Sequence, residues 1–168
     1  GNVQVEDDSV RTLYSSDNGN EWRPLAPPPT SKQCIASPAS SSSSSSHTKW
    51  HTPSGHDCGL QLHGGHKNKG VPGKWEARTH KEVEQRWGPV LSTPSAVGVM
   101  MAVGNVGERL KNSDGDLSTF VSRDAGETWS LVGEGSSQYD VGDQGTLILS
   151  ARNQVPTKEV RFSIDGGV

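Results

Sequence analysis

Histidine and cysteine side chains gather in one part of the sequence, where they could bind a metal ion or titrate. Six of them fall within 20 residues: His47, His51, His56, Cys58, His63 and His66. Two cysteines and two histidines can close a tetrahedral zinc site. The spacing matches no zinc finger, however, and the segment is low in complexity, so solvated loop histidines are the simpler interpretation. Because an unperturbed histidine has a pKa near 6.5, the same side chains could also respond to acidification.

Carboxylates form the second group that could do chemistry, since a pair of acids can cleave a glycosidic bond. Asp17, Asp124 and Asp165 occupy one position of a repeated motif, Ser-x-Asp-x-Gly-x-Thr-Trp. This pattern is the Asp-box, a hairpin turn that recurs once per blade in one class of β-propellers. Sialidases also carry it, far from their catalytic centre, and they need converging arginines and a tyrosine besides. The available candidates, which no spacing groups together, are Arg11, Arg123, Arg161 and Tyr139.

The clearest copy of the motif runs from Ser122 to Trp129, and each residue type in it has a physical reason. The aspartate can accept hydrogen bonds from nearby backbone N–H groups, and the glycine can take a positive φ where the chain reverses. The tryptophan opens the next strand and is expected to bury its ring between neighbouring sheets. The expected box residues are Ser15, Asp17, Gly19 and Trp22 in the first copy, Ser122, Asp124, Gly126, Thr128 and Trp129 in the second, and Ser163, Asp165 and Gly167 in a third that the chain end cuts off.

The spacing of the boxes predicts an all-β chain of repeated blades. The second and third aspartates are 41 residues apart, the length of one four-stranded blade, whereas the first and second are 107 apart. We assign the excess to a Ser-rich, low-complexity and disordered insertion over 30–57, and to a second insertion over 64–89 that could contain a short helix over 74–87. Strands are predicted over 11–14, 22–25, 58–63, 96–103, 117–122, 129–132, 138–141, 145–151 and 159–164, with a turn over 104–107.

The composition limits the choice of fold and partners. Only 30% of the residues are hydrophobic, while Gly and Pro number 20 and 10, which is typical of turn-rich structure with unstructured segments. A net charge of -3 with scattered basic residues argues against nucleic acid as a partner. The chain does not begin with Met and it ends inside a repeat, so we expect a fragment, about two blades of a longer protein. No apolar run approaches the roughly 20 residues that span a bilayer.

Several short signatures, in their order along the chain, resemble the sortilin-type vacuolar protein sorting receptors. They are residues 21–25, 58–63, 96–98, 104–107, 120–129, 139–145 and 160–167. The resemblance implies that residues 1–168 are part of a luminal, multi-bladed Asp-box propeller in a type I membrane receptor. Such a receptor captures protein or peptide cargo in the Golgi and carries it toward endosomes or a vacuole, without catalysis and without a cofactor. The alternatives left open are a sialidase-type glycoside hydrolase fragment and an extracellular Asp-box repeat protein with no role in trafficking.

The same resemblance gives the two cysteines a role. Members of the family have a cysteine pair in the corresponding loop, and an even number of cysteines in a luminal protein favours a disulfide. A bond between Cys34 and Cys58 is therefore implied, with two reduced thiols as the alternative. Closing a loop of this size would stabilise the fold by roughly 3 kcal/mol, because it restricts the unfolded chain.

Overall fold

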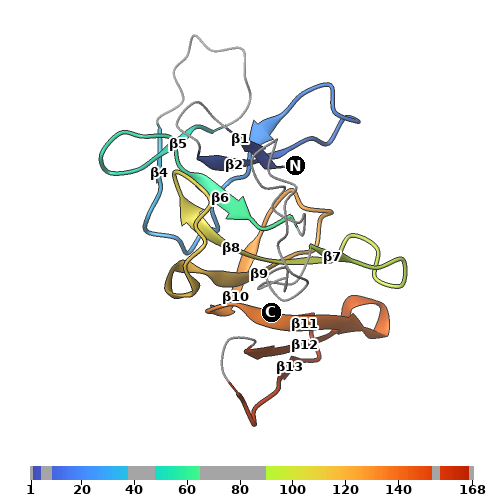
Figure 1. Ribbon diagram of the computed structural model, residues 1–168. Helices are drawn as coiled ribbons and strands as arrows, with labels where there is room; N and C mark the ends of the chain where they lie inside the picture. Colours follow the sequence, from blue (N-terminus) through green and yellow to red (C-terminus); the bar gives the residue numbers. More distant parts are fainter. Residues whose placement is uncertain (1, 5–8, 38–47, 65–89, 153–155, 167–168) are drawn as a thin grey trace, which may run out of the picture.

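The computed structural model describes residues 2–4, 9–37, 48–64, 90–152 and 156–166, and they form an all-β fold (Figure 1). This fold class is the one expected from the sequence. The strands are β1 (Asn2–Gln4), β2 (Val10–Tyr14), β3 (Arg23–Pro24), β4 (Ile35–Ala36), β5 (Trp50–His51), β6 (Gly59–Leu62), β7 (Leu91–Ser92), β8 (Met100–Gly107), β9 (Ser118–Ser122), β10 (Ser130–Glu134), β11 (Ser137–Gly142), β12 (Leu147–Arg152) and β13 (Arg161–Ser163). The short 3-10 turns are η1 (Asp114–Asp116) and η2 (Asp143–Gly145). Within the described residues, no helix has the length and hydropathy that crossing a bilayer requires.

Three antiparallel sheets follow one another along the chain. The first has the order β1-β2-β3, the middle one β10-β9-β8-β6 with β7 also paired to β8, and the third β11-β12-β13. In Figure 1 they succeed one another in space as well, from the blue strands near the N-terminus to the red strands near the C-terminus. Asp-box turns connect β2 to β3 and β9 to β10, and the third box follows β13.

Two hydrophobic clusters pack the faces of the middle sheet. The first contains Leu25, Leu60, Leu62, Ala102, Phe120 and Trp129, and the second contains Ala96, Val99, Met101, Val121, Val141 and Ile148. Neighbours in sequence alternate between the clusters, Met101 with Ala102 on β8 and Phe120 with Val121 on β9, because successive side chains of a strand point to opposite faces. The middle sheet is therefore buried on both faces, which is why its inner strand β8 begins with a continuous apolar run.

The strand predicted over 96–103 has different bounds in the structure. It begins later and extends further, as β8 (Met100–Gly107). Residues 96–99 form a tight turn in which Gly98 has φ 84°, and the Gly98 carbonyl accepts the Ala125 N–H at 2.9 Å. The prediction of a turn over 104–107 is wrong, since these residues complete β8 and pair with β6. A Cβ on Gly104 would lie 1.9 Å from the carbonyl oxygen of Gln61. Glycine is thus needed there for close approach of two strands rather than for a turn.

Two parts of the segment 30–57 that was predicted to be disordered, residues 30–37 and 48–57, are described by the structure and are ordered. Strands β4 and β5 pair with each other, Ile35 opposite His51, and the Cys58 N–H donates to the Trp50 carbonyl at 3.0 Å. The prediction of disorder is therefore wrong for residues 30–37 and 48–57. The serine tract over 40–46, most of the second insertion and the short helix expected over 74–87 lie outside the described residues.

Candidate functional site

The Asp-box from Ser122 to Trp129 is held by its own side chains. Ser122 Oγ accepts the Gly126 N–H and donates to Asp124 Oδ1, both at 2.8 Å. Asp124 accepts the N–H of Thr128 at 2.8 Å and its hydroxyl at 2.5 Å. The indole N–H of Trp129 donates to the Gly126 carbonyl at 2.9 Å, and the residue is only 4% exposed. Turn geometry and core packing are coupled through this one tryptophan.

The first box repeats this network on the β2–β3 hairpin. Gly19 N–H donates to Ser15 Oγ at 2.8 Å, Glu21 N–H donates to Asp17 Oδ1 at 3.0 Å, and the Trp22 indole donates to the Gly19 carbonyl at 3.0 Å. Glu21 stands where the second box has threonine, so the hydroxyl donor is missing. Trp22 is 51% exposed, and the expectation of a buried ring is therefore wrong for this copy.

The third box is described only as far as residue 166. Ser163 Oγ donates to Asp165 Oδ1, and the Asp165 N–H donates back to the serine hydroxyl at 3.3 Å. Gly166 N–H donates to the Thr146 carbonyl at 2.7 Å, which ties this box to the start of β12. Gly167 lies outside the described residues.

Hydrogen bonding favours the ionised form of the carboxylates of Asp17 and Asp124. The N–H of Glu21, followed by the Ser15 hydroxyl, lowers the pKa of Asp17. Burial raises the pKa of Asp124, but the hydroxyl and N–H of Thr128, together with other hydrogen bonds, outweigh it and leave that pKa lowered. A general acid needs the opposite, a carboxyl group whose pKa is raised toward the working pH. These carboxylates suit turn formation and not glycoside cleavage.

The candidate residues of a sialidase site are spread over the structure. Arg11 donates to Asp57 at 2.9 Å beside the first sheet, Arg123 lies within the second box, and Arg161 opens β13. Burial raises the pKa of Tyr139, and a hydrogen bond with the backbone of Val103 opposes that shift. Arg11 belongs to the first sheet and Arg161 to the third, and Arg123 lies at a box turn, at the strand ends opposite to Arg161. The three arginines therefore do not converge on one carboxylate.

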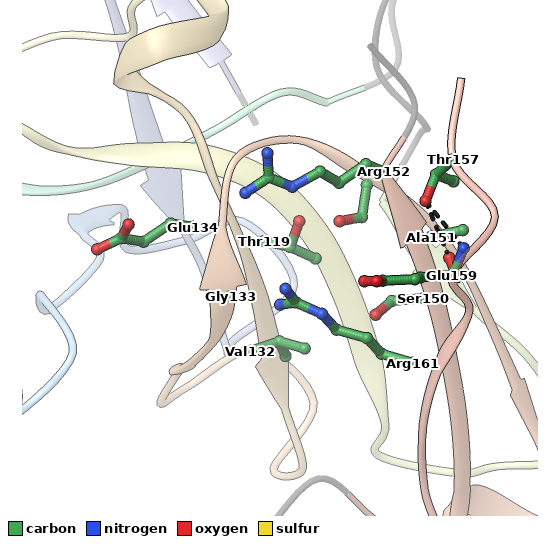
Figure 2. Close-up of a pocket in the computed structure, with 11 residues that line it drawn as sticks. Thr119, Val132, Gly133, Glu134, Ser150, Ala151, Arg152, Thr157, Glu159 and Arg161 are labelled. Carbon is green, nitrogen blue, oxygen red and sulfur yellow. Dashed lines mark hydrogen bonds between the residues drawn. The ribbon is translucent and has the colours of Figure 1, made fainter. Parts of the chain in front are cut away.

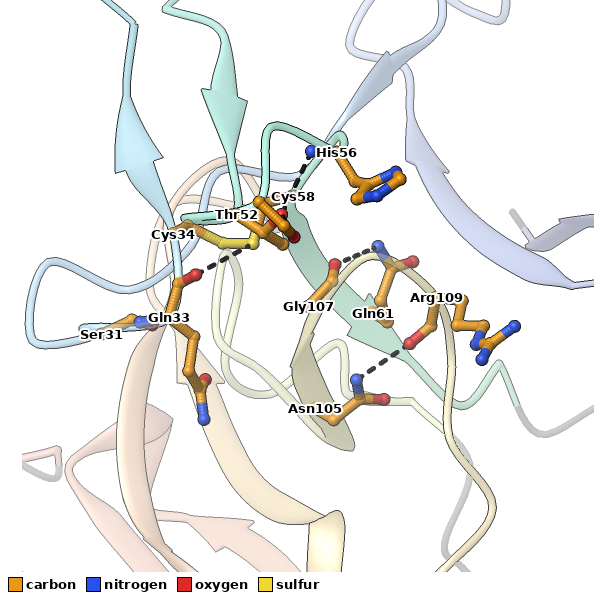
Figure 3. Close-up of a disulfide and its surroundings, with 11 residues drawn as sticks. Ser31, Gln33, Cys34, Thr52, His56, Cys58, Gln61, Asn105, Gly107 and Arg109 are labelled. Carbon is orange, nitrogen blue, oxygen red and sulfur yellow. Dashed lines mark hydrogen bonds between the residues drawn. A yellow bond between two sulfur atoms is a disulfide. The ribbon is translucent and has the colours of Figure 1, made fainter.

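A disulfide joins Cys34 to Cys58, as Figure 3 shows. It links the residue before β4 to the residue before β6, with a Cα–Cα distance of 5.6 Å, and both cysteines are buried. The bond implied by the family resemblance is therefore present.

The disulfide also bears on the zinc hypothesis. Because both sulfur atoms are bonded to each other, neither can act as a thiolate ligand, and no three His, Cys, Asp or Glu side chains gather in the described ranges. The zinc hypothesis is wrong for this pair.

The described histidines have separate partners instead of forming a cluster. His51 Nδ1 lies 2.9 Å from a serine hydroxyl next to β4, and His56 Nδ1 lies 3.7 Å from a carboxylate oxygen of Glu108. His63 Nε2 lies 2.9 Å from the Lys111 carbonyl. Burial lowers the pKa of His63, and the Lys111 carbonyl only partly opposes this. A role in pH sensing stays a prediction. The other histidines of the sequence, His47, His66 and His80, lie outside the described residues.

Contacts between the first two boxes connect the first and middle sheets. Arg23 Nη2 donates to Glu127 Oε1 at 2.6 Å, and its guanidinium carbon lies 5.6 Å from the centre of the Tyr14 ring. The Tyr14 hydroxyl reaches the Ala125 carbonyl at 3.5 Å. The box turns thus contribute to sheet stacking as well as to their own hairpins.

A small groove, open to solvent, lies between the middle and third sheets (Figure 2). We call it the β10–β13 groove. Its walls are formed by Gly133 and Glu134 of β10, Ser150 and Arg152 of β12, and Glu159 and Arg161 at the start of β13. Thr119 near the start of β9 also lines it, whereas β9 ends at the second box. The groove therefore opens at the strand ends opposite to the Asp-box turns.

Sequence reasoning did not find this groove. Arg161 was singled out only as a sialidase candidate, and Arg152 falls one residue beyond the strand predicted over 145–151. The signal in the sequence is the alternation of Ser150 and Arg152, which places both side chains on one face of a strand. The register that sets Arg161 opposite Ser150 comes from pairing between strands and has no local signal.

Comparison with known proteins gives one consistent answer. The family model described as Sortilin-Vps10, "Sortilin, neurotensin receptor 3", matches residues 2–168. A protein of Laccaria bicolor named vacuolar protein sorting/targeting protein 10 is 34% identical over 161 residues, 95% of this chain. A protein of the same name from Aspergillus terreus is 32% identical over 158 residues, 94% of this chain. The chain spans only 9% of the length of each of these two relatives.

Proposed function

Since the chain belongs to the sortilin (Vps10) family, we propose that it is a luminal, cargo-binding part of a type I transmembrane sorting receptor. The receptor would carry soluble proteins from the Golgi to endosomes or a vacuole. The observation that carries this proposal is the family match over residues 2–168, together with curated relatives named as vacuolar sorting or targeting proteins.

The disulfide supports a luminal location. Cys34 and Cys58 are bonded, and disulfides persist in oxidising compartments such as the secretory pathway, whereas thiols stay reduced in the cytosol. The bond fixes the loop that carries β4 and β5 against the entry to β6. A receptor that cycles through the Golgi lumen would keep this loop in place without a metal ion.

Stacked sheets support a binding role. Clusters on both faces of the middle sheet make a rigid scaffold, and loops at the strand ends can present side chains to a partner without disturbing it. The box turns occupy one set of strand ends, and the β10–β13 groove opens at the other. Protein or peptide cargo is the partner that such a surface would take, by contact and without chemical change.

Direct capture of cargo tests the proposal. The full-length protein that contains this chain is purified and immobilised, and the precursor of a soluble vacuolar hydrolase from the same organism is passed over it at near-neutral pH. We expect saturable binding of the precursor and none of a cytosolic protein of similar isoelectric point. The absence of binding by every vacuolar precursor tried, with the disulfide and fold intact, would contradict a cargo receptor.

A further inference from the structure

We propose that the β10–β13 groove binds an acidic side chain of an extended peptide, held by the guanidinium groups of Arg152 and Arg161. The inference rests on the proposed cargo-binding function, and it names both a place and a chemistry for the contact. Figure 2 shows the two arginine side chains extending from the β12 and β13 side toward β10.

Strand register brings the two arginines to the same face. Ser150 pairs directly with Arg161 across β12 and β13, and paired residues share a face of the sheet. Arg152 follows Ser150 by two positions on β12, so its side chain returns to that face. Three side chains with hydrogen-bond donors, two of them cationic, are thus presented together to the groove.

One guanidinium lies against β10, next to a bulge. The pairing of β10 with β9 shifts between Leu131 and Gly133. A Cβ at Gly133 would lie 3.4 Å from Arg161 Nη1, an ordinary van der Waals distance. Arg161 therefore reaches across the groove to the backbone of β10.

The two arginines have donors to spare, unlike Arg11 and Arg23. Arg11 and Arg23 each form an ion pair with a carboxylate, at 2.9 and 2.6 Å. Arg152 and Arg161 form no ion pair with any carboxylate among the residues the structure describes. The Thr119 hydroxyl beside them is engaged with the Gly135 carbonyl at 2.9 Å. An arginine presents five N–H donors in a planar fork that matches a carboxylate, so a carboxylate from outside the chain is the complementary group.

The remaining charges of the groove decide between kinds of anion. Glu134 and Glu159 also line it, so two positive and two negative side chains meet there. A lining without excess positive charge disfavours a doubly charged phosphate and suits a single carboxylate. The glutamates can in turn attract a lysine or arginine of the same ligand. A peptide in which an acidic residue is flanked by basic ones combines both requirements.

The experiment compares two peptides that differ in one functional group. Acetyl-Lys-Ala-Glu-Ala-Lys-amide and its Gln counterpart, both carrying a fluorescent label, are titrated with the full-length protein that contains this chain, and anisotropy reports binding. We expect the Kd of the Glu peptide to be lower than that of the Gln peptide by a factor of about 10 or more, since hydrogen bonds between charged groups are stronger than those to a neutral amide. The difference should shrink at high salt. Equal affinity for the two peptides would overturn the proposal.

Four variants locate the site. Arg152→Ala and Arg161→Ala should each weaken binding of the Glu peptide by about 10-fold or more, whereas Arg109→Ala, an exposed arginine outside the groove, should leave it unchanged. Arg161→Lys keeps the charge and loses the fork, so it should weaken binding by an intermediate factor. Thermal unfolding and disulfide content establish that each variant is folded. Unchanged affinity in both folded alanine variants would overturn the proposal.

Failure of this proposal and failure of the proposed function can be told apart. If the vacuolar precursor binds but the Glu and Gln peptides bind equally, cargo is captured elsewhere and only the groove assignment is wrong. If the Glu peptide binds through Arg152 and Arg161 while no precursor binds, the groove is an anion site and the receptor function is wrong.

Discussion

Leu62 and Leu91 lie on the same edge of the middle sheet, although 28 residues separate them in the sequence. Their partners on β8 are Gly104 and Met101. Two residues of β8 lie between these partners. The carbonyl of the first of them, Val103, accepts the N–H of His63 at 2.9 Å. β6 and β7 are therefore two parts of one interrupted strand along the same edge of β8.

This register predicts that residues 64–89 can be removed without changing the sheet. Joining His63 directly to Val90 keeps every partner of β7, so we expect the full-length protein with this deletion to reach the Golgi and to have a melting temperature close to that of the parent. The matched control deletes residues 64–90, one more residue, which shifts β7 by one position and turns its side chains to the opposite face. Equal behaviour of the two deletions, measured by arrival in the Golgi and by thermal unfolding, would contradict the register.

The two box tryptophans should differ sharply when truncated. Trp129 is 4% exposed and belongs to the first core cluster, whereas Trp22 is 51% exposed. Trp129→Ala should therefore cost about 3–5 kcal/mol of local stability, as buried aromatic truncations do, and Trp22→Ala should cost clearly less. Amide hydrogen exchange of β8, β9 and β10 in the full-length protein measures the difference. Similar loss of protection in both variants would mean that the boxes are packed alike.

Loss of the disulfide should destabilise the loop that carries β4 and β5. Cys34→Ser with Cys58→Ser removes a cross-link between residues 24 apart in sequence, which is expected to cost roughly 3 kcal/mol. We expect less of the full-length protein to reach the Golgi and faster proteolysis between β4 and β6. The double variant is the informative one, because a single substitution leaves a reactive thiol. Unchanged proteolysis would show that the loop is held by other contacts.

Acidification should weaken the second box through Asp124. Its pKa in the folded protein lies below the ordinary value of 3.8, so its ionised form contributes stability that is present above that value and is lost as the pH falls below it. Asp124→Asn should therefore lower the melting temperature near pH 7, and the difference from the parent should shrink as the pH falls from about 5 toward 3. The effect is small because the carboxylate is exposed. A constant difference over that range would rule out ionisation as the cause.

The ion pair between Arg23 and Glu127 should couple the first two boxes weakly. Its N–O distance is 2.6 Å, but exposed pairs contribute only about 0–1 kcal/mol. Arg23→Ala should cost more than Glu127→Ala, since arginine also covers the ring of Tyr14. A double-mutant cycle in thermal unfolding separates the two contributions. Equal costs for the single variants would leave no role for the ring contact.

Local patterns in the sequence were sufficient for the turns but not for the contacts between distant segments. The boxes at Asp17 and Asp124 could be found because their hydrogen bonds join residues at most four positions apart. Gly104 was misread, since glycine is common both in turns and where two backbones approach closely, and only the pairing with β6 distinguishes the two. Residues 96–99 were assigned to a strand because apolar character alone does not distinguish a buried turn from a buried strand.

The candidate groove was out of reach of sequence reasoning for the same reason. Arg152 and Arg161 lie on different strands, and their meeting depends on the pairing of β12 with β13. The disulfide was accessible through the family resemblance, whereas the clustering of histidines around Cys58 raised a zinc site that the bonded sulfur atoms exclude.

Transport of a soluble vacuolar hydrolase is the most direct measure of the central proposal. Cells that lack their own vacuolar sorting receptor secrete such a hydrolase, and the full-length protein containing this chain is expressed in them. We predict that intracellular retention of the hydrolase is restored, and that Cys34→Ser with Cys58→Ser reduces it. Continued secretion of the hydrolase, with the expressed protein folded and present in the Golgi, would contradict a sorting receptor.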